Sequence, residues 1–231
     1  MSESFRVWDG PLRLFHWLLA ASVGGALLTG WLGGNLMPWH GRLGLAVLGL
    51  LVFRLLWGLW GSGYARWRYL LATLPGLREE LQGRWRRPGH SPAGVLAVLA
   101  LLGLLALQLA TGLLADDEIA FHGPLQPLAS PDTSQALTRL HRQLWPWLLG
   151  MISLHLLAIL FYVRIRRRPL LRAMLTGRMP KTGAGQQDAR GGGWSRASLA
   201  LLLAALLVMA VQMWPEWRVA VPPPAAGVPD W

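Results

Sequence analysis

Five apolar runs, each long enough to cross the hydrocarbon core of a membrane as a helix, constrain this chain more than any other feature. Such a crossing takes about 20 helical residues. The predicted spans are Leu12–Gly33, Trp39–Trp60, Pro92–Leu114, Leu140–Val163 and Ser198–Trp214. Only 14% of the 231 residues are charged, which is too few to cover the surface of a soluble domain of this length. The sequence therefore predicts an all-α transmembrane protein.

A polar, glycine-rich connector, "KTGAGQQDARGGG", separates the fifth run from the other four. The stretch after the fifth run, "VPPPAAGVPDW", cannot continue a helix. We therefore expect a four-helix domain over residues 1–178 and a flexible cytoplasmic linker over residues 179–197. A fifth transmembrane helix with a proline-rich periplasmic tail would follow over residues 198–231.

Basic residues lie in two blocks, which predict the orientation of the chain in the membrane. The block between the second and third runs is Arg66, Arg68, Arg78, Arg84, Arg86 and Arg87. The block after the fourth run is Arg164, Arg166, Arg167, Arg168, Arg172, Arg178, Lys181, Arg190 and Arg196. The loop between the third and fourth runs carries Asp116, Asp117, Glu118 and Asp132 instead. Because basic loops stay in the cytoplasm, the N-terminus is predicted inside and the tail outside.

The net charge of +11 comes mainly from these basic blocks. They lie between apolar runs, where they would face the anionic lipid of the membrane surface. No base-reading motif accompanies them. Membrane lipid, and not nucleic acid, is therefore the expected partner of these charges.

The sequence contains no cysteine. This excludes disulfides, zinc sites built on thiolates, iron–sulfur clusters and covalently attached c-type haem. Any redox centre must therefore use histidine or methionine ligands and a cofactor that is held without covalent bonds.

Four of the six histidines fall within or at the ends of the predicted spans, where a histidine is costly. The predicted orientation puts His16 and His155 near the cytoplasmic side, and His40 and His141 near the outer side. Fourteen residues separate His141 from His155, so both lie on one helix face, about 21 Å apart along the axis. That distance suits two stacked cofactors and is too long for one metal centre.

Several chemistries use histidines in such positions. Two facing imidazoles from different helices are the arrangement that ligates haem iron at both axial positions. A zinc site requires three or four protein ligands, such as thiolates or carboxylates beside histidine, at one level, and the spans do not provide them. A proton relay normally includes Asp or Glu, and the spans contain neither. Histidines that bond only to headgroups or to the backbone are the structural alternative.

Three glycines could let a flat ring approach the backbone. Gly44 follows His40 by one helical turn and so lies on the same face, while Gly30 and Gly112 lie near the outer level. Close packing of helices through small residues explains these glycines equally well.

Arg54 is more informative, because it lies inside an apolar run at the depth of His155. A charge there needs an anionic partner, and we expect that no carboxylate of the protein is available. A haem propionate at the inner level would serve, and extension to the cytoplasmic headgroups is the alternative. For Arg13 and Arg42, near the ends of the first two spans, contact with headgroups is favoured over contact with propionates.

Several motifs resemble the prokaryotic cytochrome b561 family, which is grouped with the cytochrome b subunits of nickel–iron hydrogenases. They are "RVWDGPLRLFHWLLA", "WHGRLGLAVLGLLVFRLLWGLWGSGYARW", "GHSPAGVLAVLALLGLLALQLATGLL", "LHRQLWPWLLGMISLHLLAIL" and "LLRAMLTGRMP", in this order. The resemblance implies a four-helix protein of the bacterial inner membrane that holds two haem b groups. Its motifs make His16, His40, His141 and His155 the axial ligands of the haem irons. The fifth helix and its tail lie outside the resemblance.

The chain departs from the family pattern at Arg142, because an acidic residue usually follows the first histidine of the fourth span. His90 matches a recurring family feature, and we expect it to cap the third helix rather than to bond a propionate or a quinone. His122, in the acidic loop, has no counterpart in the family pattern.

We therefore expect a di-haem electron-transfer protein that links the quinone pool to a periplasmic redox partner, such as a cytochrome docked on the acidic loop. One variant is the membrane anchor of a dehydrogenase or hydrogenase, which would bind the fifth helix. Another is an enzyme that oxidises superoxide and reduces quinone. A haem-free anchor or transporter is the alternative from a different class, although the spans lack the acidic residues and broken helices of a transporter.

Overall fold

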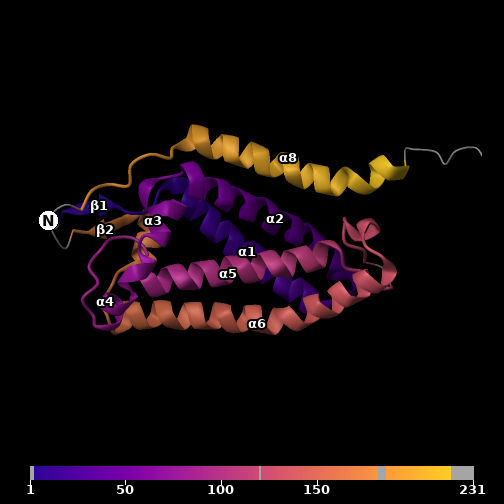
Figure 1. Ribbon diagram of the computed structural model, residues 1–231, viewed down its shortest axis with the longest axis horizontal. Coiled ribbons are helices and arrows are strands. Elements are labelled where there is room, and N and C mark those ends of the chain that lie inside the picture. Colours follow the sequence, from indigo (N-terminus) through magenta and orange to yellow (C-terminus); the bar gives the residue numbers. More distant parts are fainter. Residues whose placement is uncertain (1–2, 120, 182–185, 220–231) are drawn as a thin grey trace, which may run out of the picture.

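The computed structural model describes residues 3–119, 121–181 and 186–219, without the side chains of residues 215–219. Its long helices run roughly alongside one another (Figure 1). They are α1 (Gly10–Leu32), α2 (Met37–Trp60), α5 (Pro92–Leu113), α6 (Pro131–Arg164) and α8 (Trp194–Val219). All five are long and apolar enough to cross a membrane, which confirms the predicted all-α transmembrane fold. The predicted proline-rich tail lies outside the described residues.

Capping residues set where three of these helices begin. Asp9 accepts the N–H of Leu12 at the start of α1, at 2.7 Å, and Ser91 and Ser130 cap α5 and α6 in the same way. A proline in the first turn follows each cap, where its missing N–H costs nothing. The cap at Ser130 explains why α6 begins at Pro131, well before the predicted start at Leu140. The extra turns are polar and therefore gave no apolar signal.

The helices pack in two antiparallel pairs, and the fifth helix lies against one of them. α1 packs on α2 and α5 packs on α6, while α8 lies along α2 (Figure 1). The face of α8 that is buried carries small side chains at helical spacing, namely Ala197, Ala200 and Ala204. Small residues let helix backbones approach closely in a membrane. A separate apolar cluster in the middle of the bundle joins α1, α2, α5 and α6 through Val23, Val47, Leu51, Leu105 and Leu148.

Short elements close the two ends of the bundle. The short helices are α3 (Trp67–Leu71), α4 (Leu77–Leu81) and α7 (Leu170–Thr176), with 3₁₀ turns η1 (Gly34–Leu36), η2 (Gly63–Ala65), η3 (Leu74–Gly76) and η4 (Gln126–Leu128). Strands β1 (Ser4–Arg6) and β2 (Arg178–Pro180) pair antiparallel, with Phe5 opposite Met179.

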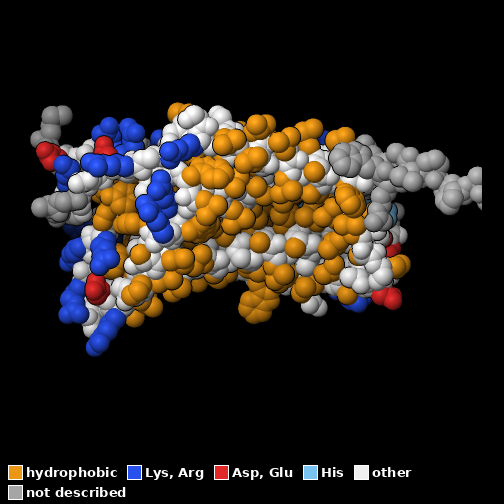
Figure 2. Space-filling model, turned by 45° about the horizontal axis from the view of Figure 1, so that its top comes forward, with side chains coloured by type: hydrophobic (Ala, Val, Ile, Leu, Met, Phe, Trp, Pro, Cys, Tyr) orange, Lys and Arg blue, Asp and Glu red, His pale blue; other side chains and the backbone are white. Residues whose placement is uncertain are grey.

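The two ends of the bundle differ in charge, with an apolar band between them (Figure 2). We call the end with the strands, α3, α4 and α7 the basic end, since Lys and Arg side chains gather there (Figure 2). We call the end with the loop between α5 and α6 the acidic end. These names describe the structure only, because the sides of the membrane follow from the sequence rule and not from the fold.

The connector before α8 is hydrogen-bonded to the basic end over its described part. The Arg6 N–H donates to Asp188 Oδ1 at 2.7 Å, and the Ala189 N–H donates to the Arg6 carbonyl at 2.7 Å. The Gly63 N–H donates to the Arg190 carbonyl at 2.9 Å. Composition alone indicated none of these contacts. The division of the chain at residues 178 and 197 stays a prediction.

Candidate functional site

The rings of His40 in α2 and His141 in α6 lie against each other at the acidic end. Their centroids are 6.0 Å apart and their planes are perpendicular. Imidazoles on opposite sides of one metal ion would also have centroids about 6 Å apart, because each metal–nitrogen bond is about 2 Å long. We call these two residues the acidic-end pair. Their spacing fits two axial ligands of one metal ion.

Backbone carbonyls hold both rings of the acidic-end pair. His40 Nδ1 lies 2.9 Å from the Ala26 carbonyl of α1, and His141 Nδ1 lies 2.8 Å from the Gln108 carbonyl of α5. A carbonyl accepts only from a protonated nitrogen, so both Nδ1 atoms are assigned as donors. This leaves each Nε2 unprotonated, which is the form that binds a metal, although His141 Nε2 lies 3.1 Å from Gln108 Nε2 and accepts its N–H.

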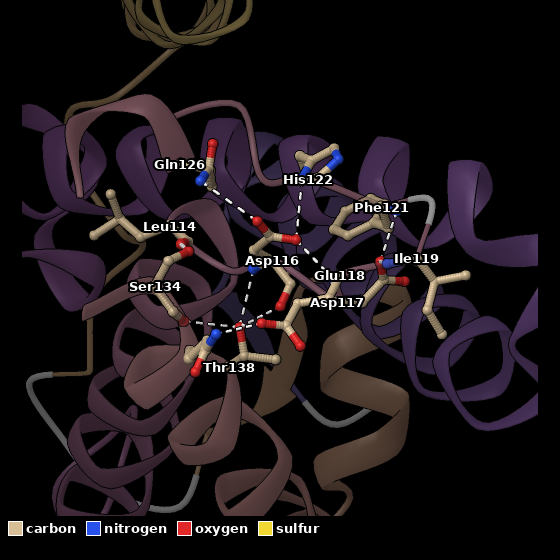
Figure 3. Close-up of polar contacts among 11 residues, drawn as sticks. Leu114, Asp116, Asp117, Glu118, Ile119, Phe121, His122, Gln126, Ser134 and Thr138 are labelled. Carbon is tan, nitrogen blue, oxygen red and sulfur yellow. Dashed lines mark hydrogen bonds and ion pairs between the residues drawn. The ribbon is translucent and has the colours of Figure 1, made fainter. Parts of the chain in front are cut away.

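The loop between α5 and α6 reaches the acidic-end pair through Phe121, and Figure 3 shows the polar contacts that hold this loop in place. The ring of Phe121 lies edge-on to His40, with centroids 6.4 Å apart. Asp117 Oδ1 accepts the Phe121 N–H at 2.8 Å. Thr138 Oγ1 accepts the Asp116 N–H at 2.9 Å and lies 3.0 Å from the Asp116 carbonyl, so the loop is fixed to α6. These contacts keep an apolar ring over His40.

His16 of α1 and His155 of α6 form a second pair, which we call the basic-end pair. They lie close enough to interact electrostatically. His16 Nδ1 is buried and, among the described residues, has no hydrogen-bond partner. The predicted pair is in ring contact at the acidic end, while at the basic end His16 and His155 lie within electrostatic reach of each other and of His90.

Arg54 lies at the basic end and is only 3% exposed, so it does not extend to the headgroups. Its guanidinium carbon is 4.3 Å from the centre of the Trp67 ring. The expectation that no carboxylate of the protein is available was wrong, because the buried Asp9 lies within electrostatic reach. Asp9 does not serve Arg54 alone, because Trp57 Nε1 and Ser62 Oγ both donate hydrogen bonds to its carboxylate. Arg54 Nη1 is left buried, with no partner in the described part of the chain.

The sequence of this chain matches the model of one protein family, prokaryotic cytochrome b561, over residues 7–177. The chain belongs to that family. No curated protein and no solved structure matched it. As a prokaryotic cytochrome b561 with five apolar helices, it is a multi-pass bacterial membrane protein of electron transfer, and the family's cofactor is haem b. The match ends before α8, so the fifth helix is an addition to the family's region.

The residues of this cytochrome b561 fit haem b in two respects. First, a Cβ built on Gly44 meets nothing within 4 Å, so there is open space beside α2 on the side of His40. Second, buried nitrogens without partners gather at the basic end, where the propionates of a haem would accept from them. Within the described residues these include Arg13 Nε, His16 Nδ1, Arg54 Nη1 and His90 Nδ1, together with the indole nitrogens of Trp60 and Trp85.

Gly30 and Gly112 of this cytochrome each lie against a histidine ring, whereas Gly44 lies beside open space. A Cβ on Gly30 would lie 2.8 Å from His40 Nδ1, and a Cβ on Gly112 would lie 2.8 Å from His141 Cε1. Real Cβ contacts are almost never so short, so both positions need glycine for the imidazole to sit beside the neighbouring helix. These glycines make room for the imidazole rings of His40 and His141.

His90 does not cap α5, which corrects the expectation from sequence, because Ser91 Oγ accepts the Gly94 N–H instead. The His90 ring packs on Trp8, with centroids 4.6 Å apart. Burial, together with the nearby charges of Arg54, His155 and His16, lowers the pKa of His90 to about 3. His90 is therefore neutral at physiological pH.

The other residues singled out from the sequence, Arg13, Arg42 and His122, each contact another residue of the chain. Arg13 Nη1 donates to the Leu175 carbonyl and so joins α1 to the end of α7. Arg42 is exposed, and its guanidinium lies 4.9 Å from the centre of the Trp39 ring. His122 Nδ1 lies 3.1 Å from Asp116 Oδ1 in the acidic-end loop (Figure 3).

Sequence reasoning missed Gln108 and Thr111 of α5. Gln108 Nε2 lies 3.1 Å from His141 Nε2 and donates to the His141 carbonyl at 3.1 Å. Thr111 Oγ1 lies 3.2 Å from His141 Nδ1. Both were visible as the amide and the hydroxyl in the run "LLALQLATGLL", where polar groups are costly.

Proposed function

We propose that this cytochrome holds two haem b groups, one at each end of the bundle, and passes electrons between membrane quinone and a periplasmic redox protein. The observation that carries the proposal is the arrangement of two histidine pairs. Each pair joins α6 to a different helix, with the His141 ring against that of His40 and His155 within electrostatic reach of His16. Gly44 and Arg54 would then serve the acidic-end and basic-end haem, respectively.

A haem supplies a one-electron carrier, and the chain's part is to fix where the two carriers stand. Both pairs use α6, a single helix of 34 residues, so the spacing of His141 and His155 along it sets the separation of the two sites. Leu148 lies midway between the two histidines of α6 and is 2% exposed within the apolar cluster of the bundle. This cluster excludes water from the space between the two levels.

The proposed orientation puts the basic end in the cytoplasm and the acidic end in the periplasm. In this orientation the loop over His40 offers a surface for a redox partner. Ile119 is 87% exposed at its tip, beside the acidic side chains of Asp117 and Glu118. An apolar contact ringed by negative charge suits a partner with a basic rim.

Electron transfer across sealed vesicles tests this function. The purified protein is reconstituted with quinol in the bilayer, and a membrane-impermeant one-electron oxidant is added on the side of the acidic end. Each quinol then becomes quinone, releases two protons and gives two electrons to two molecules of oxidant. We expect oxidant reduction well above that of protein-free vesicles, and a fall to that background for the double variant His16→Ala, His155→Ala. Equal rates for the two proteins would contradict the proposal.

A further inference from the structure

A small pocket at the basic end lies outside both histidine pairs. It has a volume of about 120 Å³. That is several times the roughly 10–15 Å³ that a single water molecule requires. The end of α6 and the stretch after it contribute Tyr162, Arg166 and Arg168 to its wall, and the segment between α4 and α5 contributes Trp85 and Arg86. The pocket therefore joins two segments that are far apart in the sequence.

The unused hydrogen-bonding groups of this pocket are donors. No hydrogen bond or ion pair engages the Arg166 guanidinium among the described residues, and Arg168 and Arg86 each donate only to nearby carbonyls. Trp85 is 2% exposed, yet its Nε1 is buried with no partner in the described residues. Three arginines and Trp85 thus line the pocket, and of their donors the Arg166 guanidinium and Trp85 Nε1 have no acceptor among the described residues.

The one carboxylate in the wall, Glu80, does not neutralise these donors. Its Oε1 accepts from the Tyr162 hydroxyl at 2.6 Å, and its Oε2 accepts the Ala93 N–H at 2.7 Å. Both oxygens are therefore committed to fixing α4 against α5 and α6. No ion pair joins Glu80 to any of the pocket's arginines in the described chain.

The backbone around the pocket is held in conformations that L-residues rarely adopt. Arg167, between Arg166 and Arg168, has φ of 53°. Gly83 has φ of 72°, and a Cβ built on it would lie 3.7 Å from Arg166 Nη1. A non-glycine residue with positive φ is uncommon and persists where the surroundings impose it. Here the turn puts the two flanking arginines in one pocket wall.

The position of the pocket at the end of a spanning helix favours a membrane lipid as its ligand. Tyr162 belongs to the last turn of α6, which ends at Arg164, so the pocket lies where a spanning helix meets the headgroup region. Ile165 and Leu81, each next to a wall residue in the sequence, are 68% and 77% exposed. Exposed apolar side chains beside a guanidinium pocket match a ligand with a phosphate and an acyl chain.

We propose that this pocket binds the headgroup phosphate of an anionic phospholipid, which bridges the end of α6 to the segment after α4. Guanidinium groups suit this role because they donate to phosphate oxygens in a planar fork. The bound lipid would stabilise the folded protein in proportion to its occupancy. The proposal does not depend on haem or on electron transfer.

Thermal unfolding of the delipidated holoprotein in detergent tests this site. Phosphatidylglycerol, phosphatidylcholine and inorganic phosphate are titrated separately at matched ionic strength. We expect phosphatidylglycerol to raise the unfolding midpoint in a saturable way, while the other two leave it unchanged. A rise with inorganic phosphate alone, or an equal rise with phosphatidylcholine, would overturn the assignment to an anionic lipid.

Variants separate the pocket from the general basic surface. In Arg166→Gln we expect the phosphatidylglycerol concentration at half-saturation to rise about tenfold, because one charge-assisted hydrogen bond is lost. Arg172→Gln, on the exposed face of α7 outside the pocket, is the matched control and should behave as the unsubstituted protein. Because the Arg166 side chain makes no hydrogen bond to the described residues, its variant should fold normally. Equal responses of the two variants would show that the lipid effect is not specific to the pocket.

Discussion

The acidic-end and basic-end histidine pairs are built differently. At the acidic end both Nδ1 atoms already have backbone acceptors, and Phe121 lies edge-on to the His40 ring. At the basic end His16 Nδ1 has no partner among the described residues, and the nearby Arg54 and His90 also carry buried, unpartnered nitrogens. An unpartnered buried polar group costs about 1–3 kcal/mol.

This difference indicates how each site gains stability when it is filled. The protein alone orients the acidic-end pair, so the proposed haem there would meet imidazoles that are already placed. At the basic end the protein leaves buried nitrogens without partners, and an anionic group could accept from them. Filling the basic-end site should therefore stabilise the fold more than filling the acidic-end site.

Single histidine variants should give the largest effects on this comparison. We expect His141→Ala and His155→Ala each to lower the haem content of the purified protein from two per chain to one. The haem that is lost should differ between them, because each variant removes a ligand from a different pair. Haem content by pyridine haemochrome, with low-temperature spectra to tell the two haems apart, measures this. If both variants lose the same haem, the two pairs are not independent sites.

Replacing Arg54 should weaken the basic-end site alone. In Arg54→Gln a charged donor to the proposed propionate is lost, so we expect the affinity for the basic-end haem to fall roughly 10- to 100-fold. The acidic-end haem should stay. Haem retention during dilution in detergent, followed by spectrum, is the measurement. Arg42→Gln is the control, since Arg42 is exposed at the other end, and equal losses in both variants would contradict the assignment.

Gly44→Ala should weaken the acidic-end site although no protein atom opposes the added methyl group. If a haem fills the open space beside Gly44, the methyl would meet it, and we expect occupancy of that haem to fall about tenfold. Gly24→Ala is the matched control, because Gly24 also has open space around its Cβ but is exposed. Identical haem contents in the two variants would show that Gly44 does not face a haem.

The smallest effect concerns the pH dependence of stability at the basic end. His90 has a pKa of about 3 in the folded protein, against about 6.5 when unfolded. The unfolded chain therefore binds the extra proton between these values, and stability falls as pH drops below about 6.5, by up to about 1.4 kcal/mol per pH unit. We expect His90→Gln to flatten the fall of the unfolding midpoint between pH 6.5 and pH 5. An unchanged slope would show that His90 does not titrate in this range.

The sequence was most informative where a single physical signal dominates. Apolar length placed the spanning helices, and the fourteen residues between His141 and His155 predicted two sites on one helix. The start of α6 at Pro131 was missed, because its first turns are polar and lie outside the apolar run. The three-residue strands Ser4–Arg6 and Arg178–Pro180 were missed as well, since such short pairings depend on the tertiary fold.

The surroundings of the candidate site were harder to predict than its ligands. Asp9 lies far from Arg54 in the sequence, and only the packing of α1 on α2 brings the carboxylate near. The cover by Phe121 depends on hydrogen bonds between the loop and Thr138, which no periodic pattern encodes. Gln108, in contrast, was detectable as a polar residue in an apolar run.

The pairing of the histidines is the central claim, and the haem content of two double variants tests it most directly. His40→Ala with His141→Ala removes both ligands of one proposed site, so one haem per chain should remain. His16→Ala with His141→Ala removes one ligand from each site, so no stably bound haem should remain. One haem per chain in the second variant would mean that His16 and His141 share a site, which would contradict the proposed pairing.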